Sequence, residues 1–340
     1  MDFKRKLPIP LEVKSQYPLS AGLRKRKKER DIEIKSILSG ESDKFLLIIG
    51  PCSADNEISA LDYVLRLAKI QEQVYEKILI IPRVYTSKPR TTGVGYKGML
   101  HQPDPFKGDD MLAGLVSVRR LHIKIMEETG LSCSDEMLYP ENFRYFSDIL
   151  SYVAIGARSA ENQQHRLVAS GLDMPVGMKN PVSGNMSTLI NSISAAQSGH
   201  MFIYRGWEVA SDGNPFAHAI LRGMTDDFGH SVPNYHYEEV MRLSALYDKA
   251  DLANKTVIID VNHSNSAKRH LEQPRICKEI LTNRAISPEH RNFVKGVMVE
   301  SYIEDGNQPT TGAVYGKSIT DPCLGWDKSE RLMFEMAESF

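Results

Sequence analysis

Cysteine, tryptophan and long apolar runs are scarce in this chain of 340 residues, which has four Cys and two Trp. The cysteines, Cys52, Cys133, Cys277 and Cys323, lie far apart and form no CxxC pair, so neither a disulfide framework nor an all-cysteine zinc site is expected. No segment approaches the roughly 18 apolar residues of a transmembrane helix, and the opening MDFKRKLPIPLEV lacks the apolar core of a signal peptide. We therefore expect a cytoplasmic protein with reduced thiols and no membrane partner.

An excess of charge of one sign is also missing. The chain has 42 Lys and Arg against 43 Asp and Glu, with a formal net charge of −1. Such a balance excludes nucleic acid as the main partner on global charge. One basic run, RKRKKER at residues 24–30, is interpreted as a solvated helix because it leads into a helical pattern.

Short apolar runs rich in Ile and Val recur along the chain, with room for a helix between them. This spacing is typical of βαβ units, in which parallel strands alternate with helices, and not of hairpins. Eight strands are predicted, at residues 44–50, 77–84, 131–136, 152–158, 174–180, 218–223, 256–263 and 293–300.

Helical patterns separate several of these runs. Residues 58–75 and 112–130 place apolar side chains three and four apart, and Gly130 is expected to cap the second of these helices. Eight strands that are apolar on both faces and alternate with helices predict an α/β fold, namely a closed (β/α)8 TIM barrel rather than a doubly wound sheet. The turn SDGNPF at 211–216 predicts a small excursion before the sixth strand.

The first 40 residues lie outside this alternation. Pro8, Pro10 and Pro18 interrupt them, which predicts an extended arm followed by a helix. We therefore expect an N-terminal arm and helix over residues 1–40 and a catalytic barrel over residues 41–340.

Each predicted strand ends in polar residues, and barrel enzymes place catalysis at these ends. Five of the strands contribute Lys or Arg, and cations crowded at one barrel mouth repel one another unless anions bind there. Phosphorylated or carboxylated substrates are therefore expected. The polar residues are Cys52, Arg83, Lys88 to Thr91, Asp135, Glu136, Arg158, Lys179, Arg222, His263 and Glu300.

A thiol, an imidazole and a carboxylate come from three different strand ends, at Cys52, His263 and Glu300, and Asp321 follows in SITDPC. This set suits Mn²⁺, Fe²⁺, Co²⁺ or Zn²⁺ better than Mg²⁺, because of the sulfur. Spacing alone leaves another interpretation open, in which Cys52 is a small core residue and His263 a loop histidine.

Several segments taken together resemble the motifs of the type I 3-deoxy-D-arabino-heptulosonate 7-phosphate (DAHP) synthases. The resemblance runs from about residue 40 to the C-terminus, and the combination of KPRT, GVMVES and SITD is its most specific part. In chain order the segments are IIGPCS, KPRTT, GYKG, AIGARS, HRLVASGLDMPVGMKN, GNPFAHAILRG, VPNYH, IIDVNHSNSAK, GVMVES and YGKSITDPCLGW.

The resemblance implies a transferase that condenses phosphoenolpyruvate with D-erythrose 4-phosphate to give DAHP and phosphate, the first step of the shikimate pathway of aromatic biosynthesis. It implies one divalent metal ion, with Mn²⁺ expected and Fe²⁺, Co²⁺ or Zn²⁺ as alternatives, and a homodimer or homotetramer. The metal ligands that it implies are Cys52, His263, Glu300 and Asp321.

The resemblance also implies which residues bind the substrates. Arg90 and Thr91 match the part of the motif suited to the aldose phosphate. Lys88, His263 and Cys52 are expected to be catalytic, and Lys88, His263 or a water molecule on the metal is left to move the protons. His263 and Asp321 are also expected to contact the substrates. The residues implied for phosphoenolpyruvate are Arg83, Lys88, Glu136, Arg158, Lys179 and Arg222.

Two other functions compete with this one. The related synthase that uses arabinose 5-phosphate carries KANRSS where this chain has KPRT, and a non-catalytic paralogue that acts as a regulatory or partner-binding subunit would not need every implied ligand. The N-terminal arm and the stretch from Phe202 to Arg222 are shorter than in the amino-acid-inhibited members. Weak or absent inhibition by Phe, Tyr or Trp is therefore expected.

Overall fold

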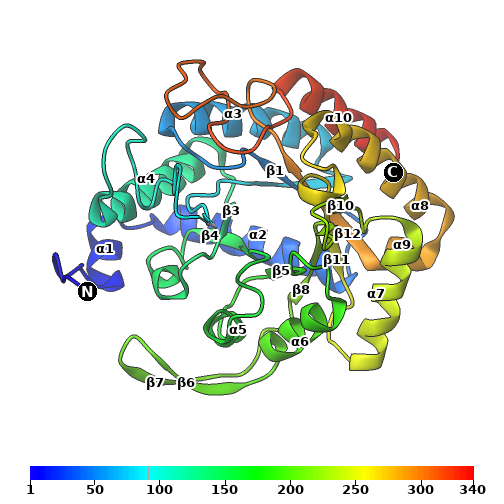
Figure 1. Ribbon diagram of the computed structural model, residues 1–340, viewed down its shortest axis with the longest axis horizontal. Helices are drawn as coiled ribbons and strands as arrows, with labels where there is room; N and C mark the ends of the chain where they lie inside the picture. The colour runs from blue at the N-terminus through cyan, green and yellow to red at the C-terminus, as the bar shows by residue number, and fades with distance from the viewer. Residues whose placement is uncertain (91) are drawn as a thin grey trace.

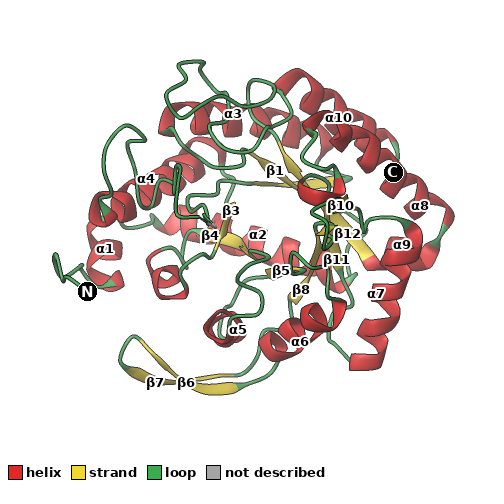
Figure 2. Cartoon of the chain, in the orientation of Figure 1, coloured by secondary structure: helices red, strands yellow, loops and turns green. Residues whose placement is uncertain are grey.

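Eight parallel strands form the centre of the molecule, one for each predicted strand (Figures 1 and 2). The computed structural model describes residues 1–90 and 92–340. Almost every strand residue is buried, as expected for strands covered on both faces. The strands are β1 Phe45–Gly50, β2 Ile78–Pro82, β3 Cys133–Glu136, β4 Leu150–Ile155, β5 Val176–Lys179, β8 Ala217–Leu221, β11 Val257–Asp260 and β12 Val294–Glu300.

The strands are hydrogen-bonded in the order β2-β1-β12-β11-β8-β5-β4-β3. A parallel bridge between Arg83, just after β2, and Ser134 of β3 joins the two ends of this order. The sheet is therefore a barrel, and all strands point their carboxyl ends toward the same mouth. The prediction of a (β/α)8 TIM barrel is confirmed.

Helices follow the strands and surround the barrel (Figure 2). The two helices predicted at 58–75 and 112–130 are confirmed to within a residue, and Gly130 ends the second with a φ of 70°. The surrounding helices are α3 Glu57–Val74, α4 Met111–Thr129, α5 Gln163–Ser170, α6 Met186–Gln197, α7 Tyr237–Ala250, α8 Gln273–Ile286, α9 Pro288–Phe293 and α10 Trp326–Glu338, with the 3₁₀ turns η1 Pro140–Tyr145, η2 His263–Asn265 and η3 His270–Glu272.

Before the barrel the chain forms a short helix, α1 (Pro10–Gln16), and a longer one, α2 (Ala21–Ser39). Ile34, Ile37 and Leu38 of α2 are buried in the same apolar cluster as the inward-facing residues of β1 and β2. Figure 1 accordingly shows α2 behind the strands, where it covers the end of the barrel opposite the mouth. The boundary at residue 40 stays a prediction, because α2 shares this cluster with the strands.

Two small antiparallel pairs interrupt the alternation. The hairpin of β6 (His200–Tyr204) and β7 (Trp207–Ser211) precedes the sixth barrel strand and stands at the rim in Figure 1. A second pair joins β9 (Met224–Thr225) to β10 (Ser231–Val232). The excursion predicted before the sixth strand is therefore this hairpin. Among the described residues no helix combines the length and apolarity needed to cross a membrane.

Candidate active site

A cavity of about 430 Å³ opens at the carboxyl ends of the barrel strands. One predicted site residue, Glu300, does not line it and is hydrogen-bonded to Arg83, which does. Thr91 falls outside the described residues. The predicted residues on the cavity wall are Cys52, Arg83, Lys88, Arg90, Glu136, Arg158, Lys179, Arg222, His263 and Asp321.

Three predicted metal ligands meet at the base of this cavity. One donor atom from each of Cys52, Glu300 and Asp321 lies within 4.8 Å of the other two. Strand register brings the first two together, since Gly50 at the end of β1 pairs with Glu300 at the end of β12. The thiol two residues after Gly50 therefore faces this carboxylate, and Cys52 Sγ lies 3.6 Å from Asp321 Oδ2.

His263, the fourth predicted ligand, lies beside this group and not inside it. Its Nε2 is 3.8 Å from Glu300 Oε1, while the compact set found among the described residues contains only the other three. Donors that share one ion, each about 2.1 Å from it, lie some 3 to 4 Å apart. The imidazole and the carboxylate therefore stand at a separation that suits one ion.

The ammonium of Lys88 contacts two of the four predicted metal ligands. Its Nζ is 2.7 Å from Cys52 Sγ and 3.1 Å from Asp321 Oδ2. Burial and the Glu300 carboxylate raise the pKa of the Cys52 thiol, so a thiolate here needs a positive charge beside it. Lys88 thus stands where a cation is favoured, and the mixed sulfur, nitrogen and oxygen donors fit a divalent transition metal.

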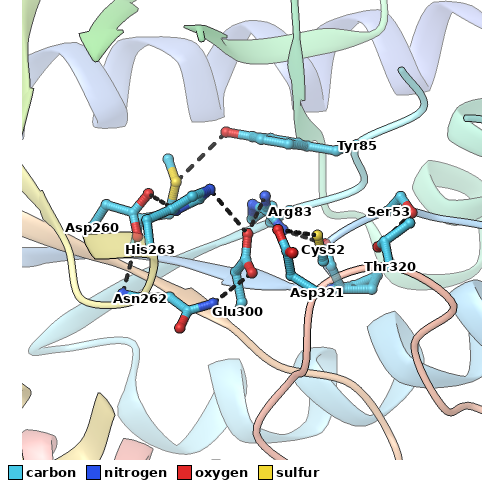
Figure 3. A network of polar contacts seen from close by, with 12 residues as sticks. Cys52, Ser53, Arg83, Tyr85, Asp260, Asn262, His263, Glu300, Thr320 and Asp321 are labelled. Carbon is cyan, nitrogen blue, oxygen red and sulfur yellow. Dashed lines mark hydrogen bonds and ion pairs between the residues drawn. The ribbon is translucent and has the colours of Figure 1, made fainter. Parts of the chain in front are cut away.

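Glu300 is fixed on both oxygens by buried side chains (Figure 3). Arg83 Nη2 donates to Oε1 at 2.8 Å, and Asn262 Nδ2 donates to Oε2 at 2.6 Å. Burial raises the pKa of Glu300, but Arg83 and His263 outweigh it and hold this pKa below its ordinary value. The carboxylate is therefore held ionised and oriented.

Asp260, at the end of β11, was missed by the sequence reasoning. This fully buried carboxylate places Oδ2 2.8 Å from His263 Nδ1 (Figure 3). The same oxygen lies 3.3 Å from Lys179 Nζ. The 2.8 Å contact is an ion-pair separation without good hydrogen-bond alignment. A proton held on Nδ1 by this carboxylate leaves the lone pair of Nε2 free toward Glu300. The position three residues before His263 was the only signal in the sequence.

Positive charge dominates the upper wall of the cavity. Seven Lys or Arg side chains line it against two acids, Glu136 and Asp321. Arg222 Nη1 is buried and has no hydrogen-bond partner in the described residues. Burial lowers the pKa of this guanidinium, which a bound anion would reverse. The cavity wall therefore carries an excess of positive charge, which suits the anionic substrates expected from the strand ends.

The seventh cation, Lys268, was also missed by the sequence reasoning. Its Nζ lies 2.9 Å from Asp321 Oδ1, while Lys88 holds the other oxygen. The backbone here is unusual, because Ala267 and Lys268 have φ values of 51° and 57° without being glycine. Such left-handed residues cost of order 1 kcal/mol each and concentrate at functional sites. In the sequence Lys268 looked like an ordinary loop lysine.

Glu136 reaches the cavity because Gly156, the residue that directly follows β4, has no side chain. A Cβ built on Gly156 would lie 2.5 Å from Glu136 Oε1. No side chain larger than hydrogen fits beside this carboxylate without displacing it. The GAR segment at 156–158 therefore makes room for one predicted site residue, Glu136, and supplies another, Arg158.

The comparison with known proteins agrees with this geometry. The family model described as the DAHP synthetase I family matches residues 20–333. The chain belongs to this family. The match also takes in the whole of α2, whereas the motifs alone pointed only to residues from about 40 onward.

Relatives of this family cover nearly the whole chain. The Trp-sensitive phospho-2-dehydro-3-deoxyheptonate aldolase of Escherichia coli (strain K12) is 34% identical over 98% of this chain and 94% of its own length. The Tyr-sensitive enzyme of the same strain is 34% identical over 97% and 92%. The solved structure of the Francisella tularensis SCHU S4 enzyme superposes with a TM-score of 0.92 at 31% identity and covers 100% of this chain and 98% of its own.

Proposed function

We propose that the 430 Å³ cavity is the active site of a DAHP synthase, which condenses phosphoenolpyruvate with D-erythrose 4-phosphate and releases phosphate. The observation that carries this is the meeting of two sets of groups in one cavity. A thiol, an imidazole and two carboxylates lie at its base, and seven cations line its wall. Both substrates are phosphorylated, so the reaction needs this excess of positive charge.

The cations bring two mutually repelling anions together. Arg83, Arg158, Lys179 and Arg222 hold the phosphate and carboxylate of phosphoenolpyruvate, and Arg90 with Thr91 takes the aldose phosphate. Arg83 is suited to a fixed role because Glu300 and the Tyr85 ring, 3.8 Å from its Cζ, lock its guanidinium. Holding both substrates in one orientation removes much of the entropic cost of their encounter.

One divalent ion, for which we propose Mn²⁺, would be held by Cys52, His263, Glu300 and Asp321. When bound, it supplies a Lewis acid that polarises the aldehyde for attack by the weakly nucleophilic carbon 3 of phosphoenolpyruvate. Lys88, which contacts Cys52 Sγ at 2.7 Å and Asp321 Oδ2 at 3.1 Å, would then be available to contact the substrate phosphate or the reacting carbonyl.

Protons must reach the new hydroxyl and leave the water that adds at carbon 2. Lys88 and His263 are the two titratable groups placed to do this, with Lys88 next to the thiol and His263 backed by Asp260. Burial lowers the pKa of His263, which favours the neutral imidazole that can accept a proton or bind a metal. Glu136, which also lines the cavity, helps to orient phosphoenolpyruvate.

Three further properties complete the proposal. We infer a cytoplasmic homodimer or homotetramer, organised as an arm and helix to residue 40 and a catalytic barrel beyond it. Inhibition by Phe, Tyr or Trp is proposed to be weak, because the arm and the hairpin are short. Less than a twofold fall in rate at millimolar concentrations of each amino acid is expected.

The test is a substrate experiment. Purified protein with Mn²⁺ is given phosphoenolpyruvate together with erythrose 4-phosphate, and loss of phosphoenolpyruvate absorbance is followed alongside phosphate release. We expect one phosphate per phosphoenolpyruvate consumed, and little consumption with arabinose 5-phosphate. Absence of consumption with every divalent ion tried would instead favour a non-catalytic barrel with a binding role.

A further inference from the structure

A second cavity, of about 700 Å³, lies at the opposite end of the barrel from the active site. Lys44 and Lys77 on its wall directly precede β1 and β2, and Lys295 is the second residue of β12. These positions are the amino ends of the strands, whereas the active site is at their carboxyl ends. The catalytic chemistry described above uses none of these residues.

This basal cavity is also lined by an excess of cations. Five Lys or Arg side chains face two acids, Asp43 and Glu76. Some of these cations already have partners: Lys44 Nζ lies 2.9 Å from Glu33, which is outside the cavity, and Lys77 donates to the Ala337 carbonyl. Within the described residues Lys44 alone has a carboxylate partner. Lys77 and Arg291 donate to backbone carbonyls, and Arg284 and Lys295 also have no carboxylate partner.

Arg284 is a buried arginine without a carboxylate partner. Its side chain is only 6% exposed, and its Nη1 donates to the backbone carbonyls of Arg291 and Val294. Its Nε has no hydrogen-bond partner, and in the part of the chain that the structure describes no acid lies within 4.0 Å of the guanidinium. Burial and the nearby charge of Arg291 lower the pKa of Arg284 to about 10.

Lys295 adds a second cation to the same wall. Burial lowers the pKa of its ammonium, and the charge of Arg284 lowers it further, whereas Asp43 acts in the opposite direction. Asp43 forms no ion pair with either cation within the described residues. Arg284 is buried and Lys295 is half-buried. Cations that are withdrawn from water, repel one another and lack an anion are costly, and a bound anion relieves that cost.

Part of the remaining wall is apolar, beside the polar residues Ser42, Asn292 and Ser339. Leu281 and Ala285 of α8 and the ring of Phe340 face the same space as the two cations. The Phe340 ring lies 5.3 Å from that of Phe45 and 5.5 Å from the Arg284 guanidinium carbon. A bare inorganic ion would leave these surfaces unused, while a ring or short alkyl chain would cover them.

We propose that this basal cavity binds a small organic anion, with its acid group against Arg284 and Lys295 and its apolar body against Leu281, Ala285 and Phe340. The site is separate from the synthase reaction, so the inference does not rest on the proposed function. A ligand here would touch the amino ends of β1 and β12, the strands that carry Cys52 and Glu300 at their other ends.

Phenyl phosphate is the probe, and the protein is first saturated with phosphoenolpyruvate and Mn²⁺ so that the catalytic cations are covered. Binding is measured by isothermal titration calorimetry. Lys295→Gln removes one cation from the cavity, whereas Lys295→Arg keeps the charge. Lys249→Gln, an exposed lysine of α7 outside the cavity, is the matched control. Arg284 is left unchanged because it also holds two backbone carbonyls.

We expect phenyl phosphate to bind to the unmodified chain and to keep its affinity for Lys295→Arg and Lys249→Gln. Its affinity for Lys295→Gln should be about tenfold or more lower, since a charge-assisted contact contributes on that order. No binding, or equal binding to Lys295→Gln and the unmodified chain, would overturn the proposal. Equal affinity for inorganic phosphate would overturn the part that assigns an apolar body to the ligand.

Discussion

Replacing Asp260 with Asn tests whether this buried carboxylate positions the metal ligand His263. The substitution keeps the size of the side chain and removes its charge. The carboxylate is fully buried and faces two groups, His263 Nδ1 at 2.8 Å and Lys179 Nζ at 3.3 Å. An amide at this position can no longer stabilise positive charge on both, and its NH₂ group can point at the ring nitrogen and favour the wrong tautomer.

Two magnitudes follow from this geometry. Loss of a carboxylate behind a ligating histidine typically costs about 10- to 100-fold in metal affinity. Lys179 is only 2% exposed, so the variant also leaves a buried ammonium without its anion. Removal of one partner from such a buried pair costs about 3 to 5 kcal/mol. We expect Asp260→Asn to be at the lower end, with an unfolding free energy about 3 kcal/mol below that of the unmodified chain, because the Asn amide oxygen can still accept one hydrogen bond.

The assay has two readouts besides activity. Mn²⁺ affinity is measured by electron paramagnetic resonance, and unfolding by urea titration, for the unmodified chain, Asp260→Asn and the control Asp212→Asn. Asp212 is exposed and has no ion pair in the described residues. Unchanged Mn²⁺ affinity in a folded Asp260→Asn protein would refute the positioning role of Asp260.

The pH dependence gives an independent check on the same variant. Burial raises the pKa of Asp260, but His263 and Lys179 outweigh it, so the folded pKa is below the unfolded value of about 3.9. The stability that the carboxylate contributes is therefore present above pH 4 and is lost as the pH falls through the folded pKa. We expect the stability gap between the unmodified chain and Asp260→Asn to narrow below pH 4.

Three other changes have defined outcomes. Gly156→Ala places a Cβ 2.5 Å from Glu136 Oε1 and so displaces this carboxylate. We expect kcat/KM for phosphoenolpyruvate to fall by about tenfold or more, because a misplaced contact spoils substrate orientation, while the circular dichroism spectrum stays unchanged. Full activity would contradict the role of Glu136. Arg119 is fully buried and donates to Asp148 and to the carbonyls of Tyr17 and Tyr145. Arg119→Met should therefore lower the unfolding free energy by about 3 to 5 kcal/mol. A loss below about 1 kcal/mol in urea titration would be inconsistent with this role. Burial raises the pKa of Asp55 to about 6, so the folded protein keeps a proton that the unfolded chain releases near pH 4. The unfolding free energy should therefore fall by about 2 to 3 kcal/mol as the pH rises from 4 to 6. In Asp55→Asn this contribution to the pH dependence should be absent.

The barrel was predictable because its signal repeats. Each strand is a short apolar run buried on both faces, as in Phe45–Gly50 and Val257–Asp260, and each is followed by a segment long enough for a helix. The helix α1 was not predicted, because an extended arm was expected from the prolines, yet Pro10 stands at its first position, where proline is tolerated. Prolines therefore marked where helices begin and not only where they are broken.

Predictability was lower for the residues that support the site. Cys52, Glu300 and Asp321 could be named because metal donors after strands are unusual and because they match family motifs. Asp260 and Lys268 could not, since their roles depend on distances across the barrel, 2.8 Å to His263 and 2.9 Å to Asp321. A strand-end aspartate and a loop lysine look ordinary until the fold brings their partners close.

The measurement that tests the account most directly is metal removal followed by titration. Protein treated with EDTA and freed of chelator is given increasing Mn²⁺, while bound ion and DAHP formation are recorded on the same samples. We predict no activity without metal and recovery that reaches its plateau at one ion per chain. Cys52→Ser and Glu300→Gln should each need at least about tenfold more Mn²⁺. Full activity in the metal-free protein, or unchanged titration in both variants, would show that this cluster is not the metal site.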